Sequence, residues 1–219
     1  MQEKFREMLH FRHACKEFDA GRKISSADFN YILEAGRLSP SSFGFEPWRF
    51  LVVQNPALRE ALKTHTWGGQ KQIPTCSHFL AVLAMKSPLL RYDSAYITHI
   101  MTDIKHLDEE RRTFRRGLYE NFQRNDFDLY GNERAVFDWA CKQTYLAMAH
   151  LMLAAAALGI DTCPIEGYDQ KEIDSTLARE FGVNLTHYGV AYMLAFGYRI
   201  KDGAPKTRRP LESVAEWFE

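Results

Sequence analysis

The stretch ERAVFDWACKQTYLAMAHLMLAAAAL, residues 133–158, is a strong indication of how this chain folds. It predicts one long helix, with Gly159 as its natural stop. After Tyr145, apolar residues lie on all sides of this helix, interrupted by His150. A helix that is apolar all round is buried all round. A single chain of 219 residues could bury it, but a dimer interface does so more easily.

Around this helix, apolar runs predict a sheet and further helices. Two runs are typical of buried strands: WRFLVVQ (48–54) and HFLAVLAMK (78–86). A short segment of GIDTCPIEGYD (159–169) and the run YGVAYMLAFGY (188–198) are predicted to be further strands. Helical spacing predicts helices over 2–12, from Ser25 or Ser26 to Leu38, over 56–63, throughout 93–123 and over 169–181. The segment RNDFDLYGN (124–132) breaks the helical pattern. The order α-α-β-α-β-α-α-α-β-α-β indicates an α+β or mixed α/β domain.

The composition favours one globular domain without a general attraction for polyanions. Apolar residues make up 46% of the chain, which is ample for a core, and 28 basic residues balance 28 acidic ones. This balance argues against a nucleic-acid partner or an anionic membrane surface. Four cysteines without a CxxC motif, no apolar signal segment in MQEKFREMLHFRH and no run of membrane-spanning length predict a reduced, cytoplasmic protein.

Several common site motifs are absent from the sequence. It has no GxGxxG after a strand, no P-loop lysine motif, no HExxH and no GxSxG elbow. The eight histidines lack the spacing to acidic residues that metal ligands show, so we expect no metal site. His150, inside the apolar helix, is expected to be a hydrogen-bonded core or interface residue.

Two basic clusters lie at opposite ends of the chain. FRHACKEFD (11–19) supplies Arg12, His13 and Lys16, and PKTRRP (205–210) supplies Lys206, Arg208 and Arg209. The clusters are either solvated surface charge or two halves of a clamp for one dianion. Proline at both ends of the second cluster holds it in a defined turn, which favours the clamp.

Two loops next to strands have an unusual composition. SPSSFGFEPWRF (39–50) combines hydroxyls, a glycine and two phenylalanines directly before a strand, so it either caps a core or forms the wall of a site. CPIEGYD (163–169) is either a helix-starting turn capped by Asp169 or a turn in which Gly167 lets the backbone approach a ligand.

Taken together, RHACKEFD, SPSSFGFEPWRF, CPIEGYD and PKTRRP resemble, in that order and spacing, the FMN-dependent, oxygen-insensitive NAD(P)H nitroreductase family. The resemblance covers essentially the whole chain. Each motif is weak alone, whereas four in register are a strong signal. The resemblance implies an α+β fold with a central, mainly antiparallel sheet flanked by helices. It also implies an intertwined homodimer with residues 133–158 as the interface helix, and one domain over 1–219 whose helical excursion at about 93–131 covers the active site.

The resemblance further implies which residues bind a tightly held, non-covalent FMN. Arg12, Lys206 and Arg208 would hold its phosphate, and Lys16 would approach the N1–C2=O side of the ring, where a cation raises the reduction potential. Ser41 and Ser42 would reach the ribityl chain and phosphate from the other subunit. The full expected set is Arg12, His13, Ala14, Lys16, Pro40, Ser41, Ser42, Gly44, Gln70, Pro164, Ile165, Glu166, Gly167, Lys206 and Arg208. For the polar contact that the family makes just before its second strand, Gln70 is preferred over Lys71 and Gln72.

The expected substrate pocket contains Phe43, Phe45 and Phe122, whereas Trp48 is expected to start the core strand. Four aromatic residues of the excursion are candidates for a lid over the site, and we expect at least half of them to pack in the core instead: Phe114, Tyr119, Phe122 and Phe127. The chain departs from the family pattern at three positions: Ala14 replaces a common serine, and Gly44 and Glu46 replace an asparagine and a glutamine. These departures leave flavin binding expected and make the substrate range less defined.

The implied function is ping-pong hydride transfer from NAD(P)H, through flavin N5, to nitroaromatic or quinone acceptors. No protein side chain acts as a nucleophile or acid–base pair, because the cofactor carries the chemistry. Alternatives are a relative that reduces enones, halogenated aromatics or free flavin, a flavin-binding protein without turnover, and a colourless helical dimer with plain basic surfaces. The sequence does not distinguish NADH from NADPH.

Overall fold

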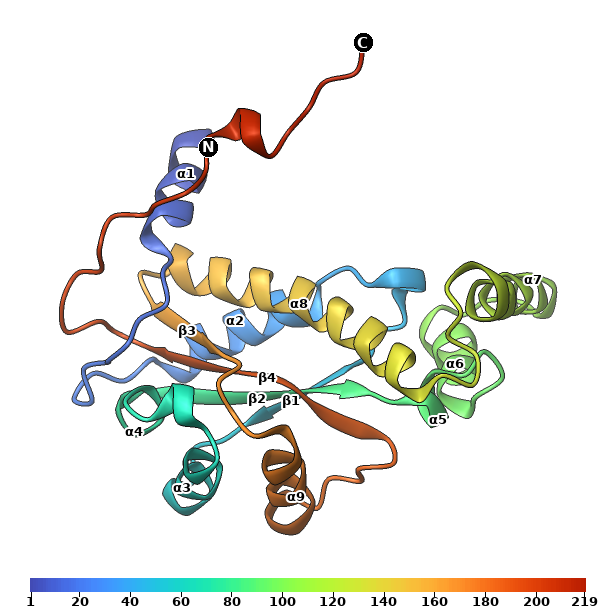
Figure 1. The fold of residues 1–219 in the computed structure, drawn as a ribbon, viewed down its shortest axis with the longest axis horizontal. Coiled ribbons are helices and arrows are strands. Elements are labelled where there is room, and N and C mark those ends of the chain that lie inside the picture. Colours follow the sequence, from blue (N-terminus) through green and yellow to red (C-terminus); the bar gives the residue numbers. More distant parts are fainter.

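The computed structural model describes residues 1–219 and consists of one sheet between two layers of helices (Figure 1). The strands are β1 (Trp48–Val52), β2 (His78–Met85), β3 (Asp161–Ile165) and β4 (Tyr188–Gly197). They are joined in the order β1-β2-β4-β3, and every neighbouring pair is antiparallel. The predicted α+β fold with a mainly antiparallel sheet is therefore confirmed.

Helices cover both faces of this sheet. One core cluster gathers α2 (Ser26–Arg37), α8 (Glu133–Ala157) and one face of the strands. The other gathers α3 (Pro56–Thr64), α4 (Gln72–Thr75), α9 (Gln170–Phe181) and the opposite face. Side chains alternate between these clusters along β2, as the two-residue period of a strand requires. The remaining helices are α1 (Gln2–Phe11), α5 (Ser87–Leu90), α6 (Ala95–His99) and α7 (Glu109–Asn121).

The predicted helix ends agree with the capping chemistry of the sequence. The Ser25 hydroxyl accepts the backbone N–H of Asp28 at the start of α2. Asp169 caps α9 through the N–H groups of Lys171 and Glu172. Gly159 follows α8 with a φ of +69°, the left-handed conformation that ends a helix.

The prediction of helix throughout 93–123 is wrong. The segment divides into α6, a π-helical turn (Ile100–Ile104), α7 and a second π-helical turn (Phe122–Asp126). His106 has a φ of +50°, which no helix accommodates, and Asp108 starts a new helix by accepting the N–H of Arg111. The break places the end of one helical segment, at Lys105, against the loop before β1.

The long helix α8 is not buried on all sides within one chain. Leu146 is 43% exposed, and Ala149, His150 and Leu158 are exposed as well. The His150 ring shares a 2.9 Å hydrogen bond with the Ser39 hydroxyl. An apolar face on the central helix therefore stays open to the outside of the chain. None of the helices, this one included, combines the length and apolar character needed to cross a bilayer.

Candidate functional site

The two ends of the chain meet beside β3. Ala14 forms a parallel bridge to Thr162, and the Cys15 N–H donates to the Thr162 carbonyl over 2.9 Å. Phe18 forms an antiparallel bridge to Arg199, just after β4. The segment that contains the first basic cluster is therefore fixed to the sheet edge, next to the chain that leads into the second cluster.

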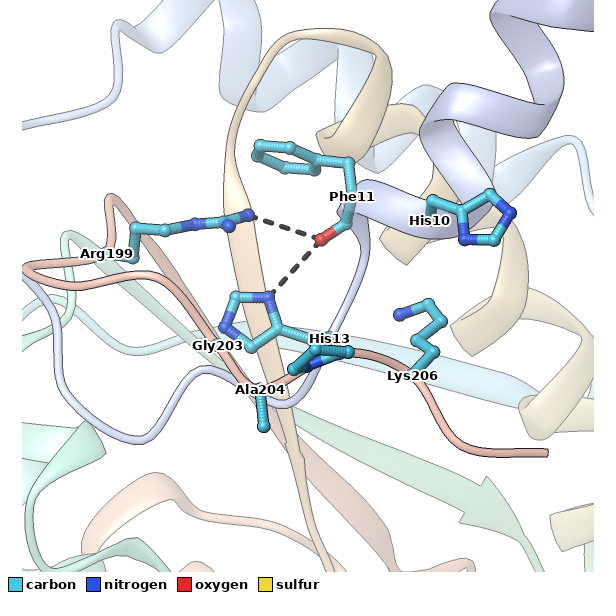
Figure 2. A pocket seen from close by; sticks show the side chains of 8 residues that line it. His10, Phe11, His13, Arg199, Gly203, Ala204 and Lys206 are labelled. Carbon is cyan, nitrogen blue, oxygen red and sulfur yellow. Dashed lines mark hydrogen bonds between the residues drawn. The ribbon is translucent and has the colours of Figure 1, made fainter.

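A buried ion pair that the sequence motifs do not include fixes this junction. The backbone N–H of Arg199 and its Nε both donate to the Asp161 carboxylate over 2.9 Å, and Asp161 is 3% exposed. Arg199 also donates from Nη2 to the Phe11 carbonyl over 3.2 Å, and its guanidinium stacks on the Phe11 ring (Figure 2). His13 Nδ1 lies 3.6 Å from Asp161 Oδ1. These contacts hold the first cluster in one orientation.

Arg12, Lys206 and Arg208 gather at this junction without a carboxylate partner of their own. Lys206 Nζ donates to the Arg12 carbonyl. Burial and then the neighbouring Arg12, Arg208 and Arg199 lower the pKa of Lys206. The ion pairs of this region belong to Arg199 and do not include the other three cations. A cavity of about 360 Å³ lies here, lined by His10, Phe11, His13, Arg199, Gly203, Ala204, Pro205 and Lys206 (Figure 2). Of the three unpaired cations only Lys206 lines this cavity, whereas Arg12 and Arg208 lie outside its lining. The positive charge around it is suited to an anion.

A second cavity adjoins the first around Lys16. It measures about 240 Å³, and both Ala14 and Lys71 line it together with Lys16. Gln70, the residue expected here, is directed elsewhere, because its amide donates to the carbonyls of Lys63 and Thr66. Lys71 rather than Gln70 therefore lies beside Lys16. Gln72 is buried, with its amide 3.7 Å from Cys163 Sγ.

The turn after β3 is supported on two sides. Pro164 and Ile165 are strand residues, paired with β4. Gly167 packs directly on Gly68, whose N–H donates to the Gly167 carbonyl over 2.7 Å. A Cβ on Gly167 would lie 2.9 Å from the Gly68 Cα, so this close approach requires glycine. The Tyr145 hydroxyl of α8 donates to the Glu166 carboxylate, a contact that the sequence does not suggest.

The loop before β1 has an ordered backbone with its own hydrogen bonds. Ser41 Oγ accepts the Glu46 N–H over 2.9 Å, and the Ser42 N–H donates to Gln143 Oε1 over 2.8 Å. Pro40 is exposed. Phe43, Gly44 and Glu46 all have positive φ, at +58°, +64° and +48°. Within one chain the contacts of this loop lead to α8 and to residues 93–131, not to the basic junction.

The three expected pocket phenylalanines form one aromatic cluster. The Phe43 ring lies 5.1 Å from Phe122 and 5.5 Å from Phe45, measured between centroids. Phe45 is only 2% exposed and belongs to the core, so it supports the cluster from behind. Tyr119 is fully buried in the same cluster, whereas Phe114 and Phe127 are exposed. Trp48 starts β1, as predicted, and stacks on Phe50. The expectation of a buried core strand is wrong here, because β1 lies at the edge of the sheet and none of its residues is buried.

Comparison with known proteins gives consistent matches over this whole architecture. The model of the Nitroreductase family matches residues 9–198. YfkO of Bacillus subtilis (strain 168), named as a candidate NAD(P)H nitroreductase, is 46% identical over 211 residues, which is 96% of each chain. A protein named in the same way from Staphylococcus haemolyticus is 48% identical over 218 residues, 100% of this chain and 99% of that one. The crystal structure of a candidate nitroreductase from Exiguobacterium sibiricum in complex with FMN has a TM-score of 0.78 at 28% identity and covers 98% of this chain and 97% of that chain.

Proposed function

The chain belongs to the nitroreductase family, and on this premise we propose that it is an FMN-dependent NAD(P)H oxidoreductase that reduces nitroaromatic or quinone acceptors. The observation that carries the proposal is the uncompensated positive charge where the two ends of the chain meet. Arg12, Lys206 and Arg208 have no carboxylate partner, and burial together with like charges lowers the pKa of Lys206. A phosphate dianion would relieve this repulsion.

The residues of the junction fit FMN in their chemistry. Arg12, Lys206 and Arg208 would hold the phosphate, and Lys16 would lie near the ring, with Lys71 beside it and Ala14 contributing backbone only. The turn Pro164–Gly167 would lie against the ring, since Gly167 has no side chain to block the approach. When bound, FMN supplies the hydride-transfer chemistry, taking a hydride from the nicotinamide and giving it to the acceptor.

The protein's own contribution is positioning and charge. Lys16 brings a cation next to the cavity at the junction, where it would favour the reduced, more negative cofactor. Tyr145 fixes the Glu166 side chain on this turn by donating a hydrogen bond to its carboxylate. Phe43 and Phe122 would form the wall on which an aromatic acceptor stacks.

We further propose that the active protein is a homodimer built on α8. The open face around Leu146 is apolar, which favours burial against a second copy. Ser41 and Ser42 lie away from the basic junction of their own chain, so they would serve the FMN of the partner. Residues 93–131 would then cover that site as part of one domain over 1–219. Four free cysteines agree with a cytoplasmic location.

An anaerobic visible spectrum of the purified protein tests this function directly. We expect flavin absorbance that bleaches on addition of NADPH or NADH and returns on addition of a nitroaromatic or quinone. Yellow protein that neither donor bleaches would favour a flavin-binding protein without turnover. If the flavin bleaches but is reoxidised only by enones, halogenated aromatics or free flavin, the acceptor is of that class and is not a nitroaromatic or quinone. Colourless protein that takes up no added FMN would overturn the proposal.

A further inference from the structure

The loop before β1 carries an unusual concentration of left-handed backbone. Phe43, Gly44 and Glu46 have positive φ within four positions, and two of them have side chains. Residues other than glycine rarely adopt this conformation, because the Cβ crowds the backbone. Such a conformation persists only where the surroundings hold it. The contacts that hold this loop are therefore informative about its role.

The loop is held from residues 93–131 by two donors. Lys105 Nζ donates to the Phe43 carbonyl over 2.6 Å, and the Tyr96 hydroxyl donates to the Phe45 carbonyl over 2.8 Å. The Tyr96 hydroxyl also lies 3.2 Å from the Glu46 carbonyl. Both donors bind backbone oxygens, so they fix the path of the chain rather than one side chain. Lys105 directly follows the π-helical turn Ile100–Ile104, where the helical segment breaks.

The missing side chain of Gly44 leaves the space that the Lys105 ammonium group occupies. A Cβ on Gly44 would lie 2.6 Å from Lys105 Nζ, and its φ of +64° disfavours a side chain independently. A side chain at position 44 would therefore require the Lys105 ammonium group to move from its place beside the Phe43 carbonyl. The asparagine that the family often carries at position 44 would have to displace Lys105.

The Glu46 carboxylate contributes a negative charge near the Lys105 ammonium group. Burial and then Arg115 lower the pKa of Lys105, whereas Glu46 raises it. Glu46 thus offsets part of the cost of bringing an ammonium group under the loop. Two positions at which the chain departs from its family, Gly44 and Glu46, are consequently explained by a third residue, Lys105.

We propose that Lys105 is a positioning residue of the active site, which fixes the Phe43–Gly44 turn and thereby sets both the flavin-facing serines and the Phe43 wall. The proposal rests on the proposed function, in which Ser41 and Ser42 reach the FMN. Lys105 itself touches neither cofactor nor acceptor in this role. Through its hydrogen bond to the Phe43 carbonyl, it ties the loop that carries the wall of the site to residues 93–131.

The test compares Lys105→Met with Lys86→Met in the full-length protein. Lys86 is the matched control, because its Nζ likewise donates to a backbone carbonyl, that of Leu185, over 2.8 Å and does not touch the loop before β1. Fluorescence titration of apoprotein with FMN should give a dissociation constant raised about tenfold for Lys105→Met, with the KM for the acceptor also raised. Lys86→Met should match wild type in both, and Lys105→Arg should recover most of the FMN affinity because it restores a donor.

Melting temperatures identify variants that are merely unfolded. If Lys105→Met melts within a few degrees of wild type but retains wild-type FMN affinity and KM, the positioning role is wrong. If wild-type protein itself binds no FMN, the proposed function fails and this inference fails with it, whereas an unchanged Lys105→Met in a flavin-binding protein overturns this inference alone.

Gly44→Ala gives an independent check by a double-mutant cycle. The new methyl group should displace Lys105 from the Phe43 carbonyl, so Gly44→Ala should reproduce the loss of FMN affinity of Lys105→Met. Combining the two substitutions should then cost less affinity than the sum of the single changes. Strictly additive losses would show that Gly44 and Lys105 act separately and would overturn the link between them.

Discussion

Arg199 and Asp161 form a bidentate pair in which one arginine uses its backbone N–H and its side chain on the same buried carboxylate. The pair joins the end of β4 to the start of β3, and Arg199 extends the connection to the Phe11 carbonyl. The N-terminal basic cluster is thus anchored through an arginine that is not expected to bind the cofactor.

Removing this carboxylate should destabilise the protein strongly. Asp161→Ala leaves a partly buried guanidinium and a backbone N–H without their acceptor, a loss of about 3 kcal/mol in the free energy of unfolding. Urea denaturation measures it. Glu34→Ala is the control, because Glu34 pairs with Arg37 on the surface and its loss should barely shift the midpoint. Equal shifts for the two variants would contradict a structural role for the buried pair.

Adding a methyl group at Gly167 should disturb the turn after β3. The new Cβ would meet the backbone of Gly68 at 2.9 Å, and backbone has no flexible end that can move aside. We expect Gly167→Ala to lower the melting temperature and weaken FMN binding. Gly117→Ala, in the middle of α7 with open space around it, should instead stabilise the protein by about 0.5–1 kcal/mol. Differential scanning fluorimetry measures the melting temperatures of both variants. A Gly167→Ala protein that melts above the Gly117→Ala protein would contradict the packing argument.

The phosphate assignment predicts unequal effects of two arginine substitutions. Arg208→Ala should raise the FMN dissociation constant by roughly 10–100-fold, since a hydrogen bond to a charged group contributes about 1.5–3 kcal/mol. Arg91→Ala removes a surface arginine that is paired with Asp93, and should leave FMN affinity unchanged. Equal flavin retention by the two variants would refute the assignment.

The open face of α8 predicts the oligomeric state. Leu146→Arg would place a charge in the proposed interface, where it lacks a partner, and should convert a dimer to a monomer. Ala57→Arg on α3, which covers the opposite side of the sheet, should leave the dimer intact. Light scattering coupled to size exclusion gives the masses. A dimer that survives Leu146→Arg would place the interface elsewhere.

A buried thiol predicts a loss of stability at alkaline pH. Burial raises the pKa of Cys76 from 9.0 to about 11. Its contribution is fully present below pH 9 and is lost between pH 9 and 11, because the unfolded thiol ionises first. The change is on the order of 2 kcal/mol. Cys76→Ala should therefore lose less stability across that window, measured by urea midpoints at each pH. Parallel curves would exclude the thiol as a source.

The sequence predicts the elements with long regular patterns. The four strands and α8 lie where their apolar periodicity indicated, and Ser25, Asp169 and Gly159 mark helix ends by their own chemistry. The four-residue helices α4 and α5 are too short to show a period. The break at His106 is not visible either, because a single left-handed residue leaves no compositional trace.

The site is predictable to a smaller extent, and mainly through the family motifs. Those motifs name the two basic segments, but the ion pair between Asp161 and Arg199 joins residues 38 positions apart that belong to no motif. The Lys105 contact to Phe43 spans 62 positions. Contacts of this kind depend on how the elements pack, which local patterns do not encode.

Gln143 and Tyr145 make contacts on two different sides of α8. Two residues apart on a helix, they lie about 200° apart around its axis, and they hold Ser42 on one side and Glu166 on the other. In the proposed dimer Ser42 serves one flavin and Glu166 the other. Each α8 would therefore connect the two active sites of the proposed dimer through these two contacts.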